Sequence, residues 1–288
     1  MLSGLPPLWV VPVAFAISFV GSLGGLSGAF LLLPFQVDVL GVLGPRATST
    51  NHLFNVLAIP AGLASLWRQR RVVGPLALAV VAGTIPGVVL GAILRVTVLS
   101  DPGLFRLFAA AVLGCAAVWL LVRQPTRRDP DPGAPLRVVD STWSRLAVAV
   151  GAREHRVSLP AVLALSLLVG LVGGAYGIGG GAILAPFLVA AFGLPVQATS
   201  GATLLGTWVS SLTAVIAYLL LPAVLPFAAA APDWALAGLL GIGGMAGIAC
   251  GSRLQTRIRS LWIERVLGLV VAGLAIRQAW EGLRAYLW

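Results

Sequence analysis

Two glycine-rich segments are the parts of this chain whose residue types could do chemistry. Residues 21–35 (GSLGGLSGAFLLLPF) and 173–187 (GGAYGIGGGAILAPF) place several glycines inside apolar runs. A glycine inside a helix costs about 1 kcal/mol relative to alanine, so each cluster predicts a helix break. The half-helix after a break starts with unpaired N–H groups and the positive end of its dipole, which attract anions. The segments therefore predict anion binding, and close helix packing is the alternative explanation.

Small polar side chains follow both segments. Residues 48–52 are Thr-Ser-Thr-Asn-His, and residues 199–203 contain two threonines and a serine. A hydroxyl at a helix start can simply be an N-cap, but paired clusters beside two breaks are plausible oxyanion ligands. For His52 an ordinary hydrogen-bonded state is favoured, and a proton-carrying or anion-pairing role is the alternative. The predicted substrate-binding residues are Gly25, Ser27, Gly28, Ser49, Asn51, His52, Gly177, Gly180, Thr199, Ser200 and Thr203.

The elements that must position these residues come from a duplicated unit. The two glycine segments align without a gap, and Ala47-Thr48-Ser49 then matches Ala198-Thr199-Ser200 after a slip of one residue. Further on, two glycine ladders with a spacing of four also correspond, and they predict helix-packing faces. Three landmarks in one order indicate an internal repeat. The ladders are Gly83, Gly87 and Gly91 in the first half, and Gly243, Gly247 and Gly251 in the second.

The composition defines the fold class as an all-α polytopic membrane protein. The chain is 59% hydrophobic and 10% charged, with a mean hydropathy of +0.99, whereas soluble domains carry about 25% charged residues. The net charge is +10, and the 19 basic residues are all arginines. They cluster in connectors between apolar runs, as the positive-inside rule describes, so nucleic acid is not an expected partner. Cys115 and Cys250 lie in apolar runs without metal-binding spacing, so neither a metal nor a cofactor is expected.

Each half is predicted to contain one broken tract and three transmembrane helices. The tracts, 8–43 and 159–194, are too long for one crossing and too short for two, which suits a re-entrant or split helix. The connector 123–157 begins with a proline-rich stretch, and its later part predicts a short amphipathic helix at the membrane surface. The predicted crossings are residues 47–67, 72–94 and 104–122, then 198–221, 234–252 and 261 onward.

The arginine clusters favour an inverted repeat. If the broken tracts are re-entrant, the clusters at 68–71, 123–157 and 253–265 all face the cytoplasm. The arginine-free connector 222–233 and both chain ends then face outside. Three crossings per half invert the second half relative to the first, a plan known from secondary transporters. The predicted domains are residues 1–123 for the first repeat, 124–157 for a cytoplasmic connector and 158–288 for the second repeat.

The sequence lacks the residues that other functions need. No Asp or Glu lies within a predicted ordinary crossing, although cation transporters generally need buried carboxylates or carbonyl rings. No Ser–His dyad or His/Asp/Glu set for an intramembrane hydrolase is present. We therefore expect no catalytic residues and no enzyme activity.

In its glycine-rich segments and the polar residues that follow them, the sequence resembles the sulfite exporter TauE/SafE family, also called the domain of unknown function 81 family. The resemblance lies in Gly177-Ile178-Gly179-Gly180-Gly181 with Pro186, in Thr50-Asn51, and in Asp233-Trp234. The first-half segment is degenerate, and His52 stands where a lysine is common. The resemblance implies a multi-pass inner-membrane protein that moves sulfite, sulfonates or related sulfur-containing anions.

Together these features predict a secondary transporter, as an exporter, of a small sulfur-containing anion such as sulfite or an organosulfonate. The expected partners are this anion and the lipid bilayer. The oligomeric state is not defined, and a homodimer is one arrangement that the sequence allows. An anion channel, and a non-transporting scaffold that recruits a partner through residues 124–157, are the alternatives.

Overall fold

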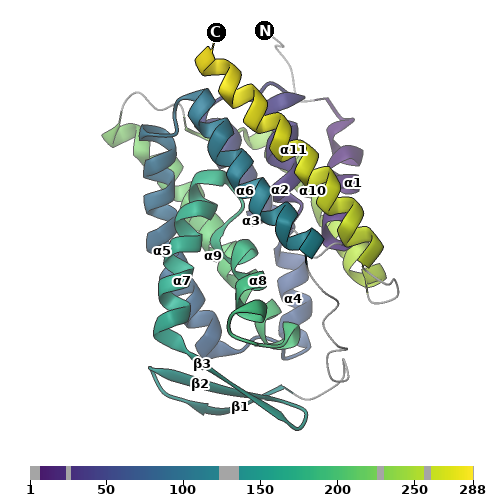
Figure 1. Cartoon of the computed structure of the whole chain (residues 1–288), viewed down its shortest axis with the longest axis vertical. Coiled ribbons are helices and arrows are strands. Elements are labelled where there is room, and N and C mark those ends of the chain that lie inside the picture. Colours follow the sequence, from purple (N-terminus) through teal and green to yellow (C-terminus); the bar gives the residue numbers. More distant parts are fainter. Residues whose placement is uncertain (1–6, 24–26, 123–135, 226–229, 256–260, 288) are drawn as a thin grey trace.

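The computed structural model describes residues 7–23, 27–122, 136–225, 230–255 and 261–287. It is a bundle of helices with a small antiparallel sheet at one end (Figure 1). The first half contains the helices α1 (Val10–Leu23), α2 (Ala29–Asp38), α3 (Pro45–Ala58), α4 (Pro60–Arg68), α5 (Gly74–Thr97) and α6 (Pro102–Val122). The second contains α7 (Leu159–Tyr176), α8 (Gly180–Ala190), α9 (Val196–Val224), α10 (Trp234–Gln255) and α11 (Leu261–Leu287).

Each glycine-rich tract folds into a pair of helices that returns to the end of the molecule from which it starts. In the first tract, Trp9 directly before α1 packs edge-on against Phe35 near the end of α2, with ring centroids 6.1 Å apart. In the second, Leu159 at the start of α7 and Leu188 near the end of α8 belong to one hydrophobic cluster with the sheet. The two pairs therefore open toward opposite ends of the bundle.

The glycine ladders pack each half against the tract of the other half. A methyl group on Gly87 would lie against the backbone of α7, at the carbonyl oxygen of Leu167, and one on Gly247 would lie against that of Phe15 in α1. Only residues without a Cβ allow two helices to approach this closely. Equivalent elements of the two halves therefore pair in the same way, α5 with α7 and α10 with α1. The orientation of the halves in a membrane stays a prediction.

The predicted crossing at 47–67 is wrong as a single helix. Two shorter helices, α3 and α4, replace it, and the break falls at Ile59, directly before Pro60. Proline lacks the N–H that would continue the helical hydrogen bonds, and its ring clashes with the carbonyl group one turn earlier in the helix. The polar residues 48–55 are therefore carried on a helix of their own.

The amphipathic helix predicted in the later part of 123–157 is also wrong. This part forms the strands β1 (Leu136–Ser141), β2 (Arg145–Val150) and β3 (Arg153–Ser158), in the order β1-β2-β3. Leu146, Val148 and Val150 are all fully buried, and the small residues Ala147 and Ala149 lie between them. The large apolar side chains therefore recur with the period of two of a strand and not with that of a helix. Gly151, with φ of 59°, makes the turn between β2 and β3. The earlier part of the connector, residues 123–135, lies outside the described residues.

Within the part of the chain that the structure describes, six helices are long and apolar enough to cross a membrane: α5, α6, α7, α9, residues 234–254 of α10 and residues 265–287 of α11. The set differs from the predicted one, because α7 qualifies by length whereas the kinked pair α3 and α4 does not. The start of α1 and the end of α11 lie at the end of the molecule opposite the sheet (Figure 1). The helical content and these spans confirm a polytopic all-α membrane protein with one small appended sheet.

Surface labelling should place the two ends of the bundle on opposite sides of the membrane. The arginine-rich sheet end is expected in the cytoplasm and the connector 222–233 outside. Cys115 and Cys250 are exposed, so both are first replaced by alanine. An impermeant maleimide should then label Ala231→Cys in intact cells, and Trp143→Cys in the sheet only after permeabilisation. Labelling of Ala231→Cys from the cytoplasm would contradict the inverted arrangement.

Candidate functional site

The first break leads into α2. Gly28 lies at its N-cap position, and the Ser27 hydroxyl accepts a hydrogen bond from the backbone N–H of Ala29 at 3.3 Å. A Cβ on Gly28 would lie 2.6 Å from the Ser18 hydroxyl oxygen. Among the described residues this buried hydroxyl of α1 has no hydrogen-bond partner. Gly25, which the sequence analysis also placed here, lies outside the described residues.

The second break needs glycine conformations. Gly177 ends α7 with φ of 105° and Gly179 precedes α8 with φ of 76°, both in the left-handed region that favours glycine. The N–H of Gly180 donates to the Ser210 hydroxyl oxygen at 3.1 Å. A Cβ on Gly180 would press against the side chain of Thr84 in α5. The start of α8 is therefore held tightly between α5, α7 and α9.

Asn51 of α3 joins the two breaks. Its Nδ2 donates to the carbonyl oxygen of Ala29 at 2.8 Å and to that of Gly177 at 3.1 Å. Its Oδ1 accepts a hydrogen bond from Nε2 of Gln36 at 3.1 Å. Beside these bonds, the Tyr176 hydroxyl donates to the carbonyl oxygen of Phe30 at 2.9 Å. The start of α2 and the end of α7, far apart in the sequence, therefore meet inside the bundle around one buried amide.

His52 also has partners on both ring nitrogens. Nε2 lies 3.2 Å from the carbonyl oxygen of Gly174, and Nδ1 lies 3.4 Å from the hydroxyl oxygen of Ser211. A carbonyl oxygen can only accept, so Nε2 carries a proton. In a neutral ring, Nδ1 then accepts from the Ser211 hydroxyl. This arrangement is that of an ordinary hydrogen-bonded histidine, the state that the sequence analysis favoured.

The other predicted hydroxyl groups bond to their own helices. Ser49 donates to the carbonyl oxygen of Arg46, Thr199 to that of Val196, and Thr203 to that of Thr199. Ser200 is only partly buried. In these bonds each hydroxyl donates its hydrogen to its own helix, so its oxygen can only accept further hydrogen bonds.

The structure adds hydroxyl groups that the sequence analysis did not select. Ser210 and Ser211 of α9 are fully buried and Thr207 is nearly so, and all three lie against the Gly179–Gly180 segment or His52. With Thr203 they have the spacing i, i+4, i+7 and i+8, which puts them on one helix face. The spacing of Thr48, Asn51, His52 and Asn55 on α3 is likewise i, i+3, i+4 and i+7. We call these eight residues the α3–α9 polar interface.

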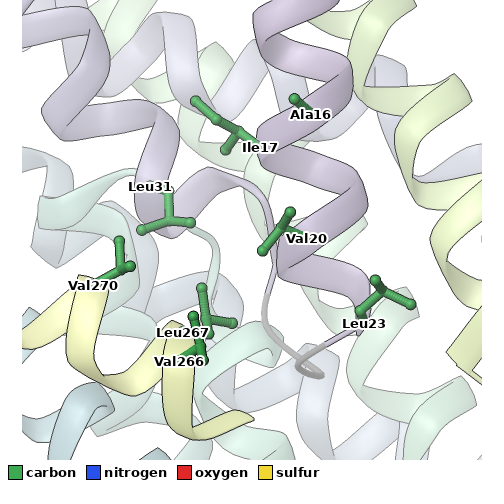
Figure 2. Close-up of a pocket in the computed structure, with 8 residues that line it drawn as sticks. All are labelled: Ala16, Ile17, Val20, Leu23, Leu31, Val266, Leu267 and Val270. Carbon is green, nitrogen blue, oxygen red and sulfur yellow. The ribbon is translucent and has the colours of Figure 1, made fainter. Parts of the chain in front are cut away.

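Two hollows in the described structure lie away from this interface. One, of about 540 Å³, lies between α1, α2 and α11, and is lined only by apolar side chains such as Ile17, Val20 and Val270 (Figure 2). The other, of about 450 Å³, lies between α6 and α11 and contains Arg106, Glu281 and Arg284. Neither is lined by a predicted site residue. The polar interface is packed in this structure, so a ligand would need movement of the helices to enter.

The fold and this interface define a class: a multi-pass helical membrane protein whose two chain breaks meet at a buried polar centre. Comparison with known proteins then identifies the family. The model of the sulfite exporter TauE/SafE family matches residues 10–278, and the chain belongs to this family.

Curated relatives agree with the family. A probable membrane transporter protein of Xylella fastidiosa strain Temecula1 is 26% identical over 271 residues, which cover 91% of this chain and 90% of the relative. Another from Xylella fastidiosa strain 9a5c is 30% identical over 140 residues. That match covers 47% of this chain and about half, 51%, of the relative. No solved structure matches the chain significantly. The protein is therefore a membrane transporter.

Proposed function

We propose that this protein is a secondary transporter that exports a small sulfur-containing anion, such as sulfite or an organosulfonate, across the inner membrane. The observation that carries the proposal is that Asn51 joins both chain breaks at a buried polar centre. The description of the family supports sulfite as the first substrate to test.

The local chemistry suits an anion. The half-helices α2 and α8 begin at the breaks, so their N-termini point toward the centre of the bundle, as the anion-binding half-helices of other transporters do. Hydroxyl and amide groups surround these starts, and at α8 the N–H of Gly180 is held by a hydroxyl and not by a charged group. A weakly held N–H can exchange this hydroxyl for an anion oxygen.

The transport cycle that we propose is a movement of one half against the other. The α2 pair opens toward one end of the bundle and the α8 pair toward the opposite end, and the centre between them is closed in this structure. Rocking along the glycine-lined contacts of α5 with α7 and α10 with α1 would expose the centre to each side in turn. If the protein forms a homodimer, this movement takes place within each protomer.

Flux into sealed vesicles tests the proposal. Purified protein in proteoliposomes should move sulfite faster than empty liposomes do, and an imposed proton or sodium gradient should change the accumulated amount. Flux that follows only the sulfite gradient and the membrane potential would indicate an anion channel. A folded protein that moves neither sulfite nor methanesulfonate would contradict transport and favour the scaffold alternative.

A further inference from the structure

Helix α5 carries an arginine inside the protein. Arg95 is 2% exposed, and it lies one helical turn after Gly91, which packs against α7. An arginine near the end of a membrane helix normally extends its side chain toward the water interface. The side chain of Arg95 instead stays in the bundle, which calls for a physical reason.

Its contacts fix the guanidinium without neutralising it. Nε donates to the hydroxyl oxygen of Thr48 at 3.0 Å, Nη1 donates to the carbonyl oxygen of Leu99, and Cζ lies 3.7 Å from the ring centroid of Phe105. A guanidinium has five N–H donors, so donors remain for a further acceptor. The Phe105 ring covers one face of the guanidinium, so the remaining N–H donors lie along its edge.

The charge of Arg95 lacks the carboxylate that other arginines of the bundle have. Arg106 and Arg277 both lie within 4 Å of the Asp38 carboxylate, whereas no ion pair within the described residues includes Arg95. An unpaired buried charge is strongly destabilising, and a cation–π contact offsets only part of this cost. An anion that enters the bundle would supply the missing charge.

Arg95 is also adjacent to the second break. Its partner Thr48 belongs to the α3–α9 polar interface, and a Cβ on Gly177 would lie 3.0 Å from the Thr48 carbonyl oxygen. Gly91, one turn earlier on α5, packs against Gly174 at the end of α7. Thr48 therefore connects the Arg95 guanidinium to the second break, where Asn51 makes the hydrogen bonds that join the two breaks.

We infer that Arg95 binds the negative charge of the transported anion and selects an oxyanion with two oxygens on one side. This assignment rests on the proposed function and deepens it. A guanidinium donates two parallel N–H groups to two oxygens of a sulfite, sulfonate or carboxylate group. A lysine would offer only a point charge, and the halides lack the paired oxygens. Sulfite and sulfonates should therefore bind more tightly than chloride.

Anion-dependent thermal stabilisation of the purified protein tests the assignment without requiring flux. Sulfite, methanesulfonate and chloride are titrated separately, and a bound anion raises the melting temperature with concentration. Arg95→Lys should weaken the apparent sulfite affinity about tenfold, which corresponds to about 1.4 kcal/mol. Arg95→Met should show no sulfite-dependent shift. Arg277→Met, which removes a half-exposed arginine paired with Asp38, should keep the wild-type affinity within about twofold.

The outcomes separate this assignment from the proposed function. Wild-type sulfite affinity in both Arg95 variants would overturn the role of Arg95 while leaving transport intact. An Arg95-dependent shift without flux in wild-type vesicles would keep the anion site and overturn transport. No shift of the wild type with sulfite or methanesulfonate would overturn the assignment. If Arg95→Met does not fold, Arg95→Lys decides, because a structural role would lower the melting temperature without changing the sulfite dependence.

Discussion

Replacing Asn51 with alanine should abolish sulfite flux and lower the melting temperature. The change removes three hydrogen bonds, to the carbonyl oxygens of Ala29 and Gly177 and from the Gln36 amide. Each buried polar group left without a partner costs roughly 1–3 kcal/mol, so the start of α2 and the end of α7 would lose their connection. We expect a flux loss of more than about tenfold, which requires only about 1.4 kcal/mol. Flux is measured in proteoliposomes and normalised to folded protein.

Asn55→Ala is the matched control for this prediction. Asn55 has the same side chain, lies one helical turn further along α3, and is equally buried. Its amide makes one described hydrogen bond, to Ser211, and its Oδ1 has no partner among the described residues. The control should therefore lose much less stability and flux. Equal losses in the two variants would show that Asn51 acts only as one of several buried polar residues.

The sequence predicted the features that depend on local backbone chemistry. Residues 177–179 do end α7 and precede α8, because only glycine adopts the left-handed φ angles at this break without strain. The glycine ladders are packing faces, as their spacing of four residues predicted. Both features can be predicted from the residue type and its spacing along the chain.

Features that depend on tertiary contacts were missed. The strands β1 to β3 form because Leu146 and Val148 are buried in one hydrophobic cluster with residues of α5, α7 and α8 at the end of the bundle, and no local pattern contains this surface. The polar face of α9 was only partly selected, although Thr207 and Ser210 follow Thr203 at helical spacing. Arg95 was not selected as a site residue, because the sequence does not show which side chains of α5 are buried in the bundle.

Loss of folded protein is the result that we expect from Gly87→Ala. The new methyl group would lie inside van der Waals distance of the Leu167 carbonyl oxygen and close to the Leu171 nitrogen. Both atoms belong to the backbone of α7, which cannot rotate away as a side chain could, so α5 and α7 must separate. Overpacking of this kind costs about 1–3 kcal/mol, which the small gain in helix propensity from alanine, about 1 kcal/mol, does not fully offset.

Gly114→Ala provides the comparison that separates packing from propensity. Gly114 also lies inside a long helix, α6, but a Cβ there would meet nothing within 4 Å, so alanine should be neutral or slightly stabilising. Fluorescence-detected size exclusion and thermal melting of the two variants measure the difference. Gly87→Ala should reduce the monodisperse yield several-fold while Gly114→Ala keeps it. Equal yields and equal melting temperatures would mean that α5 and α7 tolerate a wider spacing. The glycine ladder would then not determine the close contact of these helices, on which the proposed rocking movement depends.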